Sequence, residues 1–146
     1  MTSIPEDYSP SPTDWVREQV ETILRTGDTT GVLVRDRPVV LLTMRGARSA
    51  RTLRVPLMRV EHDGVYAAVA SKGGAPQHPQ WYHNLVAHPE ITLQDGTRSW
   101  SAVARQVDGE EREQWWARCV AAYPPYADYQ ARAERVIPVF VLEPAP

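Results

Sequence analysis

The sequence predicts a single α+β domain built on an antiparallel sheet or small β-barrel. Two observations point there: short Asp-Gly turns join several apolar strand-like runs, and helical patterns stand at the ends and between hairpins. A length of 146 residues also suits one hydrophobic core. A doubly wound parallel fold would need strand and helix to alternate throughout, and here they do not.

The N-terminal part predicts an arm followed by a helix. Residues 1–12 hold three prolines and few apolar residues, so we expect an irregular arm, with one domain over residues 13–146. Ser11 is expected to cap the helix, with Pro12 at its first position, Asp14 closing a capping box and Gly27 at its end. Its apolar stripe consists of Val16, Val20, Ile23 and Leu24.

The middle of the chain predicts strands and a first hairpin. Residues 39–44 are apolar on both faces, as in a strand covered on two sides. Residues 53–61 and 65–71 flank His62-Asp63-Gly64, which predicts that these two runs pair as a hairpin. A short helical segment is expected after Pro79, through about Ala87.

The C-terminal half repeats the pattern. Residues 91–94 and 99–107 flank an Asp95-Gly96 turn and predict a second hairpin. A helix is then expected from Asp108, with Glu111 closing its capping box, to about Tyr123. Residues 136–142 predict a last strand, and Pro138 within it favours an edge or a bulge.

Composition excludes several classes of protein. With 42% hydrophobic and 23% charged residues, a net charge of -2 and a pI near 6.1, the chain resembles neither a membrane protein, a disordered one nor a general nucleic-acid binder. Cys119 is the only cysteine, which excludes an internal disulfide. The N-terminus has no signal-peptide pattern, so a cytoplasmic location is expected. Peripheral membrane contact and oligomeric state stay open.

Two segments predict an anion-binding site. Arg45, Arg48, Arg51 and Arg54 recur at every third residue between predicted strands, and guanidinium groups match phosphate and carboxylate geometry. The alternative is a solvated loop. Residues 71–74 (SKGG) end an apolar strand, where glycines let backbone N–H groups approach a ligand and lysine adds a charge. A tight turn is the alternative here, although it leaves the lysine unexplained.

The segment after Pro79 adds features that suit a planar ligand. Free N–H groups at a helix start favour an anion, while Trp81 offers stacking and Asn84 a polar anchor. Trp81 as ordinary core is the alternative. Tyr123, Tyr126 and Tyr129 could line a cavity wall with adjustable hydroxyls, or could simply pack.

Other chemistries find little support. His78, His83 and His88 are five residues apart, a spacing that points helical side chains about 140° apart and disfavours a shared metal ion. No nucleophile elbow, Walker loop or GxGxxG motif is present.

Four stretches resemble the deazaflavin-dependent nitroreductase family of actinobacteria: LLTMRGARSARTLRVPLM, AVASKGGAPQHPQWYHNL, AAYPPYADYQ and ERVIPVFVLEP. The similarity covers about residues 39–144, and SKGGA with HPxWYxN is its most specific part. It implies a split β-barrel related to flavin mononucleotide-binding barrels and reduced coenzyme F(420) as the cofactor. The family includes quinone reductases and enzymes that reduce nitroimidazole prodrugs.

The resemblance also implies site residues. Tyr126, with Tyr123 and Tyr129, would face the substrate. Two departures concern Leu53, where many relatives carry a basic residue that Arg54 could replace, and Ala50, where glycine is common. The implied coenzyme contacts are Ala47, Arg48, Ser49, Arg54, Val55, Pro56, Leu57, Met58, Val69, Ala70, Ser71, Lys72, Gln80, Trp81, Tyr82, His83 and Asn84.

These features lead to a hypothesis with rivals. The protein would pass a hydride from reduced coenzyme F(420) to a quinone, a nitro compound or an activated alkene. A flavin mononucleotide-dependent reductase in the same barrel is the nearest alternative. A non-catalytic carrier of deazaflavin, or of another anionic planar or lipid ligand, is a rival of a different class, favoured if the tyrosines are buried.

Overall fold

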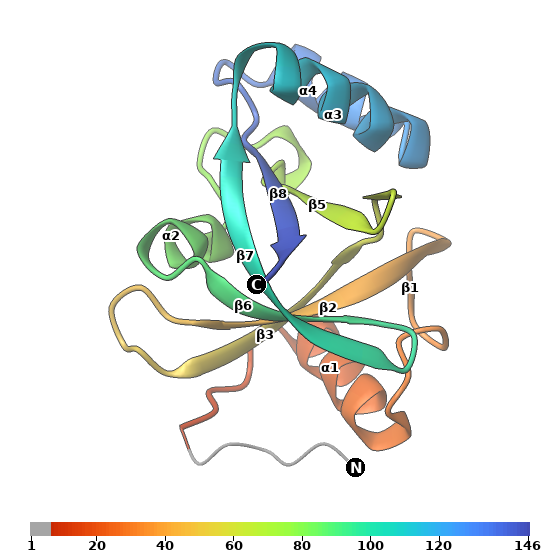
Figure 1. Ribbon diagram of the computed structural model, residues 1–146, viewed down its shortest axis with the longest axis vertical. Coiled ribbons are helices and arrows are strands. Elements are labelled where there is room, and N and C mark those ends of the chain that lie inside the picture. Colours follow the sequence, from red (N-terminus) through yellow and green to blue (C-terminus); the bar gives the residue numbers. More distant parts are fainter. Residues whose placement is uncertain (1–6) are drawn as a thin grey trace.

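The computed structural model describes residues 7–146, drawn in Figure 1. Four helices, one short 3-10 helix and eight strands make up this part of the chain. In order they are α1 (Asp14–Thr26), β1 (Leu33–Val34), β2 (Arg37–Arg45), β3 (Thr52–Met58), β4 (Glu61–His62), β5 (Val65–Val69), η1 (Lys72–Gly74), α2 (Gln80–Ala87), β6 (Glu90–Asp95), β7 (Arg98–Val107), α3 (Gly109–Ala122), α4 (Pro125–Arg132) and β8 (Val139–Pro144).

The strands form one curled antiparallel sheet. Its order is β1-β2-β6-β7-β8-β5-β4, and β3 pairs with the other side of β2. Within residues 7–146 no pairing joins β3 to β5, so the curled sheet stays open along that line. The predicted α+β class with a split barrel is therefore confirmed. Figure 1 shows α1 against one end of the sheet, α3 and α4 at the other and α2 at the side.

The first predicted hairpin is wrong in its pairing. The run over residues 53–61 breaks after Met58, and β3 pairs with β2 (Val39↔Met58) instead of with β5. Only the two residues of β4 pair with β5. The Asp63-Gly64 turn itself is confirmed, because both residues have the positive φ angles, 53° and 81°, that a two-residue turn of this type needs. The second hairpin, β6 with β7, is confirmed.

Other boundary predictions are corrected. Helix α1 begins at Asp14, after Pro12, and Ser11 accepts a bond from the Thr13 N–H without capping the helix. Asp14 pairs with an arginine, and Glu111 does the same, so neither closes a capping box. Pro138 stands just before β8, which lies inside the sheet between β7 and β5. The edge prediction is therefore wrong: the strand begins once the proline is passed.

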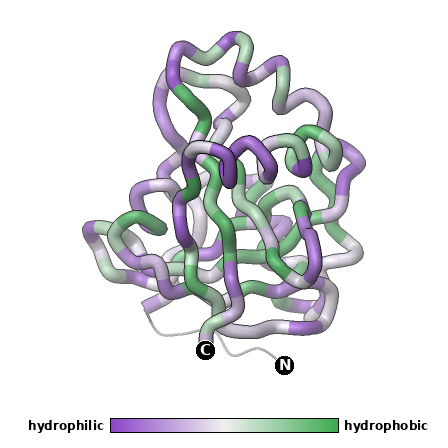
Figure 2. The backbone as a smooth tube through the Cα atoms, turned by 45° about the horizontal axis from the view of Figure 1, so that its top comes forward, coloured by the Kyte–Doolittle hydropathy of each residue, from purple (hydrophilic) through white to green (hydrophobic). Residues whose placement is uncertain are grey.

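Three apolar clusters stabilise this arrangement. Alternate residues of β2 point to opposite faces. Leu42 and its even-numbered neighbours face the barrel interior with Leu93 and Phe140, while Leu41 packs against α1. The third cluster lies between the sheet and α3–α4. Figure 2 shows the hydrophobic stretches running along the strands. The apolar stripe of α1 packs against β2 in one of these clusters.

No helix in residues 7–146 is long and apolar enough to cross a membrane.

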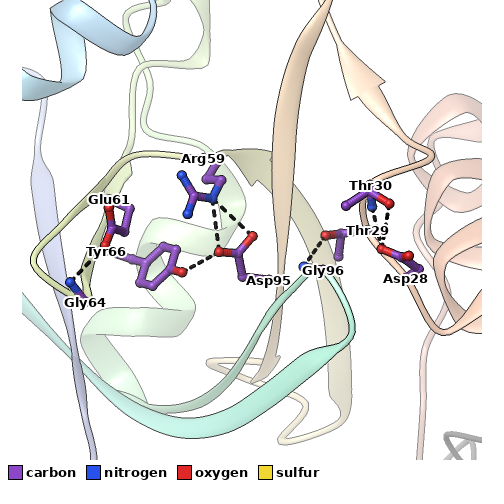
Figure 3. A network of polar contacts seen from close by, with 9 residues as sticks. All are labelled: Asp28, Thr29, Thr30, Arg59, Glu61, Gly64, Tyr66, Asp95 and Gly96. Atoms are coloured by element: carbon purple, nitrogen blue, oxygen red, sulfur yellow. Dashed lines mark hydrogen bonds and ion pairs between the residues drawn. The ribbon is translucent and has the colours of Figure 1, made fainter.

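A polar network holds the barrel end where β5 begins (Figure 3). Asp95 accepts hydrogen bonds from the Arg59 Nε, at 3.0 and 3.1 Å, and from the Tyr66 hydroxyl. Next to it, the Gly96 N–H donates to the Thr29 hydroxyl at 2.7 Å. These contacts join the β6–β7 turn to the segment after β3 and to the loop after α1. They fix this end of the barrel.

The single thiol is buried in this fold, which leads to a first prediction. Cys119 is fully buried, and burial raises its pKa to about 12. Because only the thiolate reacts with disulfide reagents, we expect the native protein to react roughly a thousandfold more slowly than the unfolded chain at pH 8. Absorbance of the released aryl thiolate measures both rates. Equal rates would show that the α3 packing opens readily.

Candidate functional site

A largely apolar pocket of about 260 Å³ lies between β3, α2 and the N-terminal arm. Its lining includes residues from four separate stretches of sequence, so the fold alone creates it. Trp81 supplies a broad aromatic surface and Arg54 a positive charge. The lining residues are Ser9, Pro10, Ser11, Pro12, Val16, Met44, Leu53, Arg54, Val55, Gln80, Trp81 and Asn84.

Arg54 is the most unusual group of this pocket. The residue is only 8% exposed, and its Nη1 is buried without a hydrogen-bond partner among residues 7–146. The guanidinium lies 4.7 Å from the centre of the Tyr8 ring, a favourable cation–π contact. A buried cation with a free donor is costly unless an anion completes it. The pocket therefore suits a ligand with an anionic group.

The arm is fixed as the outer wall of this pocket. Ser9 donates its N–H to the Thr52 carbonyl at 2.9 Å, and Thr52 donates to the Asp7 carbonyl at 3.1 Å. Arg51 reaches the Tyr8 carbonyl at 3.3 Å. Residues 7–9 thus lie against the sheet edge at β3 through backbone bonds, and residues 7–12 form no helix or strand, as predicted for an irregular arm. The rest of the predicted arm, residues 1–6, lies outside the described residues.

The arginine loop is anchored to α2. Asn84 is buried and accepts the Ala47 N–H at 2.9 Å, while its amide group contacts the Met44 sulfur. Ser49 accepts the Arg51 N–H and so tightens the loop. Arg48 is exposed, as are Arg45 and Arg51. Of the four arginines in the series, only Arg54 enters the pocket.

The SKGG segment forms a left-handed turn at the end of β5. Lys72, Gly73 and Gly74 have φ angles of 45°, 65° and 84°, and Ser71 is buried at the turn's start. The glycines are therefore required by the backbone, as the tight-turn interpretation expects. Lys72 is exposed, and it is the only lysine of the chain. A charge presented on a strained, well-fixed turn suits a ligand contact.

Helix α2 turns two aromatic rings toward the barrel interior. The Trp81 and Tyr82 ring centres lie 6.2 and 5.7 Å from the Phe140 ring. Tyr82 also stacks on His78 at 4.0 Å, whereas His83 is exposed. Trp81 combines both interpretations of the sequence, since it packs on the core and lines the pocket. Within residues 7–146 no cluster of three or more histidine, cysteine or acidic side chains could hold a metal ion.

Two of the three tyrosines, which the sequence left open as either a cavity wall or packing, are buried in the fold. Tyr123 and Tyr126 are buried in the cluster under α3 and α4, and the Tyr123 and Tyr129 hydroxyls share a hydrogen bond of 2.9 Å. Burial raises the pKa of Tyr126 well above its ordinary value. None of the three lines the Arg54 pocket. Packing therefore accounts for Tyr123 and Tyr126, whereas Tyr129 is half-buried and its backbone lies against Gly74 of the SKGG turn.

The remaining predicted contacts divide into two groups. Val55, Gln80 and Asn84 line the pocket with Arg54 and Trp81. Pro56 is buried and Leu57 faces the barrel core, Met58 packs toward α3–α4, and Val69 and Ala70 are buried beneath the SKGG turn. Sequence reasoning missed Met44, Val16 and the arm residues 9–12. Their only signal was proximity to a motif, and pairing between distant segments carries no local pattern.

Comparison with known proteins finds similarity to F420H(2)-dependent quinone reductases. The family model for F420H(2)-dependent quinone reductases matches residues 15–144. A putative F420H(2)-dependent quinone reductase of Mycobacterium tuberculosis is 34% identical over 107 residues, covering 73% of this chain and 90% of that protein. An F420H(2)-dependent quinone reductase of the same organism is 34% identical over 108 residues, covering 72% of each.

Several solved structures are similar to this chain. One described as a domain-swapped dimer is 57% identical with a TM-score of 0.72, covering 91% of this chain and 100% of that one. An F420-H2 dependent reductase is 55% identical with a TM-score of 0.70, covering 77% and 100%. The heme storage protein HutZ of Vibrio cholerae, 16% identical with a TM-score of 0.56 and coverage of 77% and 84%, shares the fold alone.

Proposed function

The chain belongs to the F420H(2)-dependent quinone reductase family, and we propose that it transfers a hydride from reduced coenzyme F(420) to a quinone. Membership makes it an oxidoreductase that uses this coenzyme. The finer proposal is where the coenzyme binds and which acceptors are reduced. Nitro compounds and activated alkenes belong to the proposal as further acceptors, because each can accept a hydride and then a proton as a quinone does.

The observation that carries the binding site is the unpaired Nη1 of Arg54. A deazaflavin coenzyme combines a flat ring with a phosphate and a carboxylate tail, and this pocket combines an aromatic wall with a buried, incompletely bonded cation. Arg54 would bind an anionic group and Trp81 would pack on an apolar one. Lys72 and the SKGG backbone would supply a second positive region.

Bound coenzyme supplies hydride donation, and the protein's residues bind, orient and exclude water. Leu53, Val55 and Met44 keep the pocket apolar, which strengthens the electrostatic contacts within it. The arm over the pocket adds a wall that shields it from solvent. On the acceptor side we propose that Tyr129, with Tyr126 and Tyr123 behind it, orients the substrate. The burial of two phenols means that their part is support rather than direct contact.

Two alternatives can be separated from this proposal by one experiment. Purified protein is titrated with coenzyme F(420) and with flavin mononucleotide while tryptophan fluorescence is followed. Oxidation of reduced coenzyme is then measured with and without menadione and a nitroaromatic. We expect deazaflavin to quench more strongly and oxidation to depend on the acceptor. Tight binding without oxidation would establish a carrier, and stronger quenching by flavin mononucleotide would establish a flavin enzyme.

Lys72 allows a second prediction. Replacing Lys72 by Ala removes an exposed cation, so we expect coenzyme affinity to fall about two- to fivefold, with little change in the free energy of unfolding. Raising the salt concentration should weaken the wild-type complex and the variant by different amounts, because one ionic contact is missing. Fluorescence titration measures both. If wild type and the Lys72 variant bind the coenzyme equally well, the anionic group of the coenzyme does not contact the SKGG turn.

A further inference from the structure

Arg135 is tied to the loop between β5 and α2 by every donor it has. It stands between α4 and β8, far from that loop in sequence, and its side chain is partly buried. The guanidinium offers five N–H donors in a rigid fork. They meet the carbonyls of Ala75 (Nε, 3.0 Å), Ala70 (Nη1, 3.2 Å), Ser71 (Nη2, 3.0 Å) and Gln77 (Nη2, 3.1 Å), and the Nδ1 of His78 (Nη1, 3.0 Å).

These partners stand at both ends of loop 70–78. Ala70 and Ser71 precede the SKGG turn, while Gln77 and His78 lead into α2. One planar group therefore closes the base of the loop, with Lys72 and Gly73 at its exposed tip. Because the fork is already planar, it fixes several carbonyls with little further loss of side-chain freedom. The contact replaces the regular pairing that an irregular loop lacks.

His78 is the one side chain in this set. Its ring faces Arg135, the exposed His83 at 6.2 Å and the Tyr82 ring at 4.0 Å. Burial, followed by the charges of Arg135 and His83, lowers the pKa of His78. The ring is thereby neutral at pH 7, and Nδ1 can accept the guanidinium N–H. Stacking on Tyr82 joins the loop to α2 and so to Trp81, which lines the pocket.

A second contact from α4 provides a comparison. Arg132 donates to the Gly73 carbonyl at 3.2 Å, but it is exposed, and this is the one hydrogen bond of its side chain within residues 7–146. The backbone of Gly74 also lies against the backbone of Tyr129. The segment from α4 to β8 thus forms a frame for the loop, and Arg135 makes most of its polar contacts.

We propose that Arg135 is the positioning residue of the coenzyme loop, holding residues 70–78 in the conformation that presents Lys72 and the SKGG backbone before the ligand binds. Preorganisation of this kind raises affinity, because the loop does not have to be ordered on binding. The part of the proposal that concerns the coenzyme rests on the proposed function. The part that concerns loop order does not.

The single lysine makes loop order measurable without any ligand. Endoproteinase Lys-C cuts after lysine, so native protein can be cut only at Lys72, giving fragments 1–72 and 73–146. Cleavage requires local opening of the loop. We expect Arg135→Met to be cut about tenfold faster than wild type or more, and the matched Arg132→Met within about threefold of wild type, because five bonds are lost in one case and one in the other.

Further variants and readouts keep the test decisive. If Arg135→Met does not fold, His78→Phe can replace it. This variant removes one of the five bonds and keeps the stacking on Tyr82, so the rate of Lys-C cleavage should rise about two- to threefold.

In the folded Arg135 variant, the KM for coenzyme should rise about tenfold while kcat at saturating coenzyme stays within about twofold. Unchanged Lys-C cleavage, or faster cleavage with unchanged coenzyme affinity, would overturn the positioning role. If wild-type protein binds no coenzyme, the proposed function is wrong, but the cleavage result still tests loop order.

Discussion

Replacing Arg54 by Met is expected to weaken coenzyme binding about 10- to 100-fold while the ligand-free protein becomes no less stable. Hydrogen bonds to charged groups contribute about 1.5–3 kcal/mol, which sets the first effect. The second follows because the Nη1 of Arg54 is buried without a partner in the described part of the chain, so an apolar side chain of similar length removes a desolvated charge. Fluorescence titration measures the affinity, and urea unfolding measures the free energy of unfolding.

Arg51→Met is the matched control for this change. Arg51 belongs to the same series, but it is exposed, and within residues 7–146 its guanidinium hydrogen-bonds only to the Tyr8 carbonyl at the edge of the arm. Its loss should change coenzyme affinity less than about threefold. Weaker coenzyme binding without a loss of unfolding free energy in Arg54→Met would show that this charge serves ligand binding. If Arg54→Met lowers the free energy of unfolding by several kcal/mol and leaves affinity unchanged, Arg54 serves the fold.

Replacing Gly74 by Ala is expected to lower the free energy of unfolding by about 2–4 kcal/mol. A Cβ there would stand 2.9 Å from the Tyr129 carbonyl oxygen and 3.2 Å from its Cα, and neither backbone atom can move without shifting α4. The φ angle of 84° adds a conformational cost of roughly 1–2 kcal/mol for any residue with a side chain. Coenzyme affinity should fall as well, because the SKGG turn and α4 separate.

Gly73→Ala separates the two causes. Gly73 has a φ of 65°, but a Cβ there would meet nothing within 4 Å. Only the conformational cost applies, so a loss of about 1–2 kcal/mol is expected. Urea unfolding of both variants gives the difference. If both substitutions lower the free energy of unfolding by the same amount, the turn does not lie against α4 as described.

The fold was largely predictable because its signals are local. Two-residue turns with glycine at positive φ and an apolar run covered on both faces located β2, the β4–β5 turn and the β6–β7 hairpin. The pairing of β3 with β2 was not predictable, because residues 53–61 read as one strand and the break after Met58 depends on which neighbour each part meets. The starts of α2 after Pro79 and of α3 after Asp108 were predicted correctly. The capping boxes were not, because Asp14 and Glu111 pair with arginines that a capping pattern does not reveal.

The sequence predicted only some of the residues that line the candidate site. The arginine series suggested an anion, but nothing in its regular spacing showed that only Arg54 would be buried; that follows from its place inside β3 and beneath the arm. The phenol series suggested a cavity wall, yet two of its rings pack under α3 and α4. Arg135 had no signal at all, because its five partners lie more than fifty residues away in sequence.

The location of the coenzyme site is the central claim, and amide hydrogen exchange with and without coenzyme F(420) tests it most directly. We expect added coenzyme to slow exchange in peptides covering residues 7–16, 44–58 and 71–84. The β6–β7 turn, held at the other end of the barrel by Asp95, should keep its rate and serves as the internal control. Slower exchange at that turn with none near Arg54 and Lys72 would contradict the site proposed for this protein.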